Sequence, residues 1–254
     1  SDVYKRQVLS RCFKKKISTS PISIYRALRY LNPSPYLFYI NLDKFCIVGS
    51  SPEILVRLSN KIVTIRPIAG TRKRGQSHKE DLKLKDELLN DPKEKSEHLM
   101  LLDLGRNDVS RVTKPGSVNI TDKMIVEYFS HVMHIVSNVN GVIKDNLDNV
   151  DALFAGFPAG TVSGAPKIRA MEIIEELEKN KRNIYAGAIG YLSANGNLDS
   201  CIALRTAVIK DNNIYIQSGA GIVADSRSKS EYKETENKAL ALLEAVVYSK
   251  NFDI

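Results

Sequence analysis

Tyr36–Ile65 reads YLFYINLDKFCIVGSSPEILVRLSNKIVTI, and this stretch decides the fold. It holds four short apolar runs separated by turn residues: Tyr36–Leu42, Phe45–Val48, Ile54–Leu58 and Ile62–Ile65. Runs of this length, bounded by Asn, Asp, Gly, Pro and Ser, are typical of strands joined by short turns. We therefore predict an antiparallel meander here.

Blocks of helices and blocks of strands surround this meander. Helices are predicted at Pro21–Leu31, Lys79–Leu89, Lys93–Asp103 (Leu99 and Leu102 inward), Val150–Phe154, Ala165–Lys179 and Ser230–Tyr248. Further strands are predicted at Val118–Ile120, Met124–Tyr128, Val132–Val139, Gly187–Ser193, Cys201–Ile209 and Ile214–Ser218, and a polar loop at Gly70–Ser77. Because the two kinds of element do not alternate, we predict an α+β fold with antiparallel β-sheets flanked by helices.

Composition narrows the class of protein. A chain of 254 residues can bury a sizeable core, as one large domain or two small ones. No apolar run is long enough to span a membrane, and no secretory signal is visible. The three cysteines are far apart, so we expect buried thiols and a cytoplasmic protein. The net charge of +8 fits an anionic substrate or an acidic partner, whereas short basic clusters without Trp support nucleic-acid binding only weakly.

The first seven residues, SDVYKRQ, join poorly to the text that follows. We interpret residues 1–7 as a non-native or scar segment and exclude them from fold reasoning. Residues 8–254 are then expected to form one domain.

Two Glu-x-x-Glu pairs carry the strongest chemical signal. Glu94 and Glu97 form the first pair, and Glu231 and Glu234 form the second. Each pair is predicted to lie on one face of a helix, where like charges repel unless a cation or solvent relieves them. Carboxylates without a soft ligand nearby suit Mg²⁺, but solvated helix faces would give the same pattern.

Two glycine-rich stretches and the isolated Arg205 point to an anionic ligand, and His134 is a further isolated candidate. The loop containing Thr161 and Ser163 leads into a predicted helix, and its N–H groups could hold a carboxylate or simply cap the helix. The second stretch, 217–222, is expected to follow a strand and to allow close backbone approach. Arg205, within an apolar strand, needs an anionic partner, from a substrate or from the protein. His134 is a catalyst or a core residue.

The order of the longer motifs is more specific than any single one. They read PIAGTRKRG, EHLMLLDLGRNDVSRV, HVMHIVS, FPAGTVSGAPKIRAMEIIEELE, YAGAIGYL, CIALRTAV, QSGAGIVADS and EYKETENKA. Together they closely resemble the chorismate-utilising enzymes, and above all the catalytic portion of anthranilate synthase component I. The resemblance implies layered antiparallel sheets, and a chain that is incomplete at its N-terminal side.

The resemblance also implies a role for each site residue. Glu94, Glu97, Glu231 and Glu234 match the family's Mg²⁺ ligands. The residues that match the substrate-binding pocket are Gly70, Thr161, Tyr185, Arg205, Gly219, Ala220 and Gly221. Glu53 matches the general acid that protonates the departing ring hydroxyl, and His134 matches the histidine linked to loss of the enolpyruvyl group; we place both, with Thr161, in the catalytic set. Expelling hydroxide needs such a proton donor.

The implied reaction joins ammonia to the chorismate ring and then eliminates pyruvate to give anthranilate. Ammonia normally comes from glutamine through a separate amidotransferase subunit, and no cysteine here sits in a nucleophile elbow, so a partner subunit is implied. We expect no partner among nucleic acids or membranes. Asn32, Pro33, Ser34, Pro35 and Tyr36 resemble part of the site where these synthases bind tryptophan as inhibitor.

Three alternatives remain open at this point. Aminodeoxychorismate synthases commonly carry a lysine where this chain has Ala69, which argues against them. Isochorismate and salicylate synthases use a lysine near the start of this region, which falls at about Arg6 in the excluded segment. The third alternative is an inactive fragment, for which lost strands would leave an exposed sheet edge.

Overall fold

The computed structural model describes residues 6–129 and 132–252. Of the interpreted scar segment, residues 1–5 lie outside the described residues, whereas Arg6 and Gln7 begin a strand. The chain divides into two compact units. The first takes in the chain up to Glu53, Val162–Ile189 and the chain from Cys201 onward, and the second takes in Ile54–Thr161 and Gly190–Ser200.

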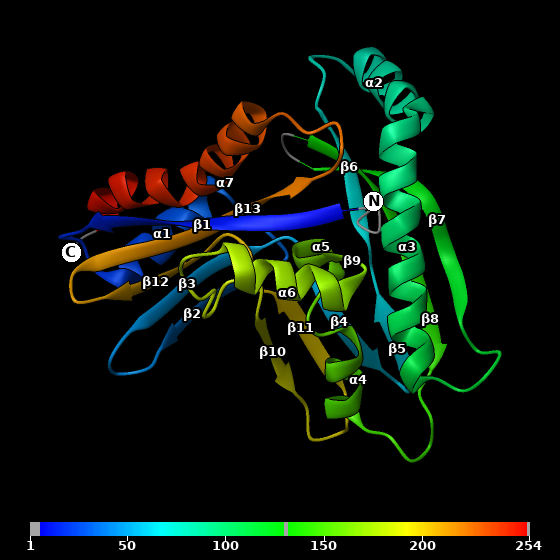
Figure 1. Ribbon diagram of the computed structural model, residues 1–254. Helices are drawn as coiled ribbons and strands as arrows, with labels where there is room; N and C mark the ends of the chain where they lie inside the picture. The colour runs from blue at the N-terminus through cyan, green and yellow to red at the C-terminus, as the bar shows by residue number, and fades with distance from the viewer. Residues whose placement is uncertain (1–5, 130–131, 253–254) are drawn as a thin grey trace. The chain divides into compact units, whose positions relative to one another are not determined.

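The first unit is built on a six-stranded sheet in the order β2-β3-β12-β13-β1-β9. Its strands are β1 (Arg6–Lys16), β2 (Tyr36–Asn41), β3 (Cys46–Ser51), β9 (Gly164–Ala165), β12 (Thr206–Lys210) and β13 (Asn213–Ile222). All of their pairings are antiparallel. The long strands β1 and β13 lie side by side although they come from opposite ends of the sequence (Figure 1).

Two helices bury their apolar faces against this sheet. They are α1 (Pro21–Leu31), begun by the Ser20 cap, and α7 (Ser228–Tyr248), which continues into the 3₁₀ turn Ser249–Phe252. Their core contains Ile24 and Leu28 from α1 and Ala239 and Leu242 from α7. Ala239 and Leu242 recur at helical spacing, which gives α7 an apolar stripe on the side of the sheet. A third helix, α6 (Lys167–Leu177), packs on β1 and β9.

The second unit is built on a seven-stranded sheet in the order β10-β11-β4-β5-β8-β6, with β7 also paired to β8. Its strands are β4 (Ile54–Ser59), β5 (Ile62–Ile65), β6 (Ile68–Lys73), β7 (Asn119–Tyr128), β8 (Val132–Val142), β10 (Ala188–Leu192) and β11 (Leu198–Ile202). Its helices are α2 (His78–Asn90), α3 (Pro92–Val112), α4 (Asn149–Gly156) and the short α5 (Gly160–Ser163). Figure 1 shows α3 running along the strands β6 and β8, which it contacts. The predicted class, antiparallel sheets flanked by helices, is confirmed.

The predicted four-strand meander is wrong in its connectivity. β2 pairs with β3 and β4 pairs with β5, but the two hairpins belong to different sheets. The chain leaves the first sheet at Ser51-Pro52-Glu53, where Pro52 has no N–H to donate to a ladder. Periodicity identifies strands but not the sheet that each one joins.

Three boundaries also differ from prediction. The loop expected from Gly70 is the strand β6 as far as Lys73, paired with β8 through a bulge at Ala69/Thr71. The strand expected at Cys201–Ile209 is interrupted, because Arg205 has a φ of +46°. The glycine stretch expected to follow a strand lies inside β13.

Several predicted inward faces are different too. In α3, Leu99 is 44% exposed and His98 is fully buried in its place. In α6, Ile168 is 72% exposed and only Ala170 is buried. The cysteines are not uniformly buried: Cys12 is exposed, Cys46 intermediate and Cys201 buried. Among the residues that the structure describes, no helix is long and apolar enough to cross a membrane.

Candidate active site

The first pair of acids lies at the start of α3 in the second unit. Asp91 caps this helix by accepting the N–H groups of Lys93 and Glu94, and Pro92 occupies the first turn. Glu94 and Glu97 follow on one helical face, both partly buried. This cap fixes the start of α3, and the start of the helix sets the positions of Glu94 and Glu97.

Gly70 approaches this pair closely. Its φ is +79°, and a Cβ added there would lie 3.2 Å from Oε2 of Glu94 and 3.1 Å from Cδ1 of Ile135. Both the backbone conformation and the space thus require glycine. The structure brings Gly70 and Glu94 together, as the site prediction expects.

Arg72 is a part of this site that the sequence analysis missed. Its Nη1 donates to Glu94 at 2.9 Å and its Nη2 donates to Asp91 at 2.6 Å. The guanidinium thus ties β6 to the first turn of α3. The sequence offered one signal for Arg72, namely its position two residues after the expected pocket residue Gly70.

His134 lies on β8 beside the same backbone segment. Its Nδ1 is 3.0 Å from the hydroxyl of Thr71 and 3.1 Å from the carbonyl oxygen of Gly70. Because a carbonyl only accepts, Nδ1 carries the proton in the tautomer that makes this bond. The ring of Phe129 meets the imidazole edge-on, with 5.3 Å between centroids. Thr161, also in this unit, is partly buried in α5.

His98, next to Glu97, was not singled out from the sequence. It is fully buried, its Nε2 lies 2.7 Å from the hydroxyl of Ser137, and the same hydroxyl accepts the N–H of Met124. Burial lowers the pKa of His98 to about 4, so the imidazole is neutral and clips α3 to β7 and β8.

Arg205 is the most informative residue of the first unit. It occupies the break between β11 and β12 at positive φ, and its carbonyl accepts the N–H of Ser50. Burial lowers the pKa of its guanidinium, because no nearby carboxylate offsets the lost hydration. Within residues 6–129 and 132–252, no acidic side chain forms an ion pair with Arg205. A partly buried cation in this condition is suited to an anionic ligand.

The glycine stretch lies on β13 opposite β1, where Gly221 pairs with Val8 and Gly219 with Ser10. A Cβ at Gly219 would come within 2.7 Å of the Tyr185 hydroxyl, and one at Gly221 would come within 3.2 Å of the Arg6 guanidinium. Polar side chains therefore lie close to the backbone of Gly219 and Gly221; that this stretch, with Ala220, approaches an anion stays a prediction.

Tyr185 is buried, and burial raises the pKa of its hydroxyl to about 12. A backbone hydrogen bond from Gly219 acts in the opposite direction by favouring the ionised form, as a donated N–H does. The hydroxyl lies against the Gly219 backbone, since a Cβ added at Gly219 would be 2.7 Å from it. The structure brings Tyr185 to the glycine stretch.

Glu53 is buried at the end of β3, where its backbone carbonyl accepts the N–H of Ile202 and its N–H donates to the Ser51 hydroxyl. The neighbouring Ser51 donates its hydroxyl to the carbonyl of Ile202 at 2.6 Å, which connects Glu53 to the Arg205 segment. Three hydrogen bonds thus join the segments that carry Glu53 and Arg205: the two made with Ile202, and the one from the Ser50 N–H to the Arg205 carbonyl.

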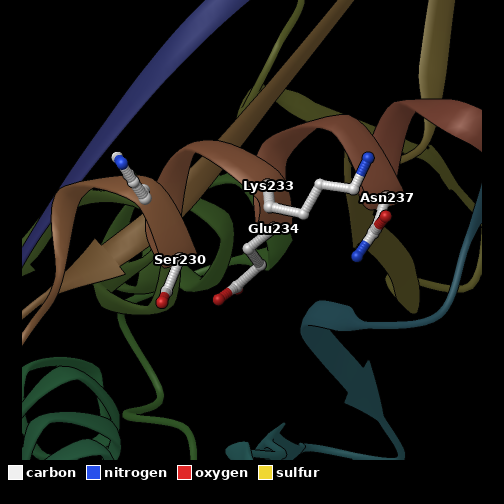
Figure 2. Close-up of a pocket in the computed structure, with 5 residues that line it drawn as sticks. Ser230, Lys233, Glu234 and Asn237 are labelled. Carbon is white, nitrogen blue, oxygen red and sulfur yellow. The ribbon is translucent and has the colours of Figure 1, made fainter.

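The second pair of acids lies in the first two turns of α7. Glu231 and Glu234 are both partly buried. Figure 2 shows Ser230 and Glu234 pointing the same way into a pocket that is lined by one stretch of the helix. Glu234 pairs with Lys238 at 2.6 Å, and Lys238 also donates to the carbonyl oxygen of Gly219 at 3.0 Å.

The two pairs of glutamates lie in different units. Within the described ranges, no three or more His, Cys, Asp or Glu side chains gather where they could hold a metal ion. Glu94 and Glu97 belong to the second unit, and Glu231 and Glu234 belong to the first. The donors are all carboxylate oxygens, which suits a hard divalent cation.

The segment Asn32–Tyr36 joins α1 to β2. Asn32 ends the helix, and its carbonyl accepts the Ser50 hydroxyl at 2.6 Å. Tyr36 is the first residue of β2 and pairs with Ser51. The segment is thus part of the first unit's sheet edge; its resemblance to a tryptophan site stays a prediction.

Residues 2–244 match the family model of chorismate binding enzymes. The chain belongs to this family. It is 57% identical to anthranilate synthase component 1 of Aquifex aeolicus over 239 residues, which is 94% of this chain and 48% of that protein. It is 62% identical to the same component of Cereibacter sphaeroides over 89% of this chain and 45% of that protein. The chain thus spans about half the length of these relatives.

Solved structures give the same result for the fold. Anthranilate synthase component I of Streptococcus pneumoniae TIGR4 superposes with a TM-score of 0.88 at 49% identity, over 94% of this chain and 53% of that one. The menaquinone-specific isochorismate synthase of Escherichia coli also gives a TM-score of 0.88, at 27% identity, over 96% of this chain and 56% of that one. The recognition of the family from its motifs is confirmed. Because members with different products share the fold, shape alone does not select the product.

Proposed function

We propose that this chain carries the synthase chemistry of anthranilate synthase component 1, converting chorismate and ammonia to anthranilate and pyruvate. The observation that carries the proposal is Arg205, a partly buried and desolvated guanidinium that no carboxylate of the described chain neutralises. Chorismate has two carboxylates, and one of them would supply the missing charge. The identity of 56–62% to several such synthases supports this product over others.

Substrate binding would use the arrangement in the first unit. Arg205 would pair with the enolpyruvyl carboxylate, and Tyr185 would donate its hydroxyl proton to the same group. Glycine at position 221 lets the Arg6 guanidinium lie close to the backbone, because a side chain there would meet it. Together these contacts would fix the orientation of the ring before reaction.

The chemistry would need a proton donor and a way to lose pyruvate. Glu53 would give its proton to the ring hydroxyl as that group leaves and the nitrogen of ammonia bonds to the ring. His134, held by Gly70 and Thr71, would act near the ring as the enolpyruvyl group departs and the ring aromatises. Thr161 would line the same pocket.

Mg²⁺ is the cofactor that the acids would accept. Glu94, Glu97, Glu231 and Glu234 offer the oxygen donors that this ion prefers. The ion would supply charge neutralisation for the ring carboxylate of chorismate. In the present structure Arg72 and Lys238 engage two of these glutamates, so the ion would compete with both cations.

The partner implied by the name of the relatives is a second component. We propose that a glutamine amidotransferase subunit delivers ammonia, and that the reaction belongs to tryptophan biosynthesis in the cytoplasm. Tryptophan would be an inhibitor of the full-length protein through the segment at Asn32–Tyr36.

Two alternative products are each disfavoured by a specific observation. Isochorismate synthases share this fold, but at 27–28% identity. Aminodeoxychorismate synthases would need a lysine at position 69, where a buried alanine stands. The alanine leaves no amine to form a covalent bond with the ring.

The test is anthranilate fluorescence from this chain with chorismate, Mg²⁺ and an ammonium salt. Ammonia replaces the partner subunit, so the assay isolates the synthase step. Fluorescent product that requires Mg²⁺, and that Glu234→Gln abolishes, is the expected result. Consumption of chorismate to a different aromatic acid or to isochorismate, seen by chromatography, would reject the anthranilate assignment. Chorismate left intact by a folded chain would reject activity of this portion alone.

A further inference from the structure

A buried ion pair lies behind the residues expected to bind substrate. Glu178, the residue that ends α6, and Arg182, in the segment after the helix, form an ion pair with side chains 6% and 15% exposed. Nη2 of Arg182 is 2.6 Å from Oε1 of Glu178, and its Nε is 3.0 Å from Oε2. This is a bidentate pair, the geometry in which arginine binds carboxylates most specifically.

Further hydrogen bonds made by the two side chains join three segments of the first unit. Glu178 accepts both the N–H of Ser10, at 2.7 Å, and its hydroxyl, at 2.9 Å. Arg182 donates to the carbonyl of Val162 at 2.6 Å and to that of Val8 at 2.9 Å. Neither charge is therefore left unsatisfied, although both are buried.

Val8 and Ser10 are the partners of the substrate-binding glycines. On the antiparallel ladder, Val8 faces Gly221 and Ser10 faces Gly219. The ion pair therefore keeps β1 in place, and β1 pairs with the part of β13 that contains the glycine stretch. Gln217 adds to this by donating to the Ser10 hydroxyl at 2.8 Å.

Arg182 also contacts Tyr185 directly. Its Cζ lies 5.5 Å from the centre of the tyrosine ring, and its carbonyl accepts the tyrosine N–H at 2.9 Å. On the far side of the ring, the hydroxyl meets the backbone of Gly219. The ring is therefore fixed at one end by the arginine and at the other by the strand that the arginine positions.

We propose that the Glu178–Arg182 pair is a positioning element that aims the Tyr185 hydroxyl and the Gly219–Gly221 backbone at the substrate carboxylate. Neither side chain touches the substrate in this assignment. The inference rests on the proposed function, because it assigns the pair a purpose in binding chorismate.

The first experiment separates positioning from stability. Arg182→Met leaves Glu178 as a buried, unpaired charge, so it lowers both the thermal midpoint and the affinity for chorismate. Glu178→Leu with Arg182→Met removes both charges and should recover most of the thermal midpoint. If the pair positions Tyr185, the chorismate KM stays about tenfold raised in the double variant, with kcat much less affected. A KM that returns to the wild-type value together with stability would overturn the proposal.

A matched control comes from α6, the helix that precedes Arg182. Arg169 pairs with Glu172 and Glu176 at the exposed surface of α6. Arg169→Met makes the same substitution without a buried partner, and KM and kcat should equal those of the wild type. Arg182→Lys should recover only part of the affinity, because one ammonium cannot reproduce the bidentate fork and both carbonyl contacts.

The second readout does not depend on catalysis. With 3-fluorotyrosine incorporated, the ¹⁹F resonance of Tyr185 is assigned by its loss in Tyr185→Phe. The resonance should shift in Arg182→Met and in the double variant but not in Arg169→Met. An unmoved resonance would overturn the proposal. If it moves while wild-type chain neither binds nor converts chorismate, the proposed function fails and the coupling between Arg182 and Tyr185 stands.

Discussion

Lys238 bridges Glu234 and the substrate-binding strand: its ammonium is 2.6 Å from a carboxylate oxygen of Glu234 and 3.0 Å from the carbonyl oxygen of Gly219. One side chain thus connects an expected Mg²⁺ ligand with the expected carboxylate-binding backbone. The ammonium also neutralises Glu234 when no other cation is present. Mg²⁺ would have to displace this contact.

Replacing Lys238 should therefore change metal affinity in a definite direction. In Lys238→Met, Glu234 loses its competing cation, and the concentration of Mg²⁺ for half-maximal binding should fall by about two- to fivefold, the equivalent of a partly exposed ion pair. Titration calorimetry without substrate measures it. Lys233→Met removes the ammonium that pairs with Glu236 on the same helix, and should leave the affinity unchanged. Weaker Mg²⁺ binding by Lys238→Met would contradict the competition.

Variants at Gly70 and Gly116 separate the effect of a close contact from the effect of backbone strain. Gly70→Ala places a Cβ against Glu94 and Ile135 at positive φ, whereas Gly116→Ala meets the same strain, φ +76°, with nothing within 4 Å. Both variants should lose about 1 kcal/mol of unfolding free energy from the strained backbone. Only Gly70→Ala should also raise the Mg²⁺ requirement, measured by fluorescence assay. Equal activity of the two variants would show that the contact is irrelevant.

His98 should prove to be a structural clip. His98→Ala leaves a cavity and removes the partner of the buried Ser137 hydroxyl, so it should cost about 2–4 kcal/mol of unfolding free energy in urea titrations. His98→Leu in combination with Ser137→Ala removes both polar partners and should recover part of that loss. A loss below that of Leu99→Ala, a change at the exposed neighbouring position, would mean that the imidazole contributes nothing.

Asp81 should make stability depend on acid pH. Its pKa is lowered first by the hydrogen bond from the Arg74 side chain and next by the N–H of Gly75. An acid with a lowered folded pKa is charged in both states at neutral pH, and the stabilisation it gives is lost as pH falls below its ordinary value of 3.8. Asp81→Asn should therefore lower the thermal midpoint at pH 7 and differ less from the wild type at pH 3. A constant difference across that range would contradict the linkage.

Sequence patterns predicted most elements but not their neighbours. The spacing of apolar residues indicated α1, α2 and α7 almost to the residue, because each buries one stripe on a sheet. The assignment of β3 and β4 to different sheets depends on contacts with β12 and β11, which are distant in sequence. No local pattern carries that information.

The site shows the same division between local and distant causes. Glycine at position 70 and the two Glu-x-x-Glu pairs are local signals, and the sequence revealed them. The break at Arg205 is not local: its positive φ is maintained by hydrogen bonds that Ile202 and Ser50 make across the unit. Glu178 and Arg182 are four residues apart in the sequence, but no local pattern shows that their side chains are buried together, and this burial decides their importance.

Arg205 gives the sharpest test of the proposed function. A buried arginine with a structural partner is destabilising to remove, because the partner is left unpaired. Arg205 has no such partner within the described chain, so Arg205→Met should keep or raise the thermal midpoint while chorismate binding weakens about 100-fold or more, as for a lost charge-assisted pair. Arg182→Met, which breaks a satisfied pair, should do the opposite to stability. Calorimetric unfolding and chorismate titration of the two variants measure both effects. If Arg205→Met unfolds the protein as Arg182→Met does, Arg205 is a structural residue and the substrate carboxylate must bind elsewhere.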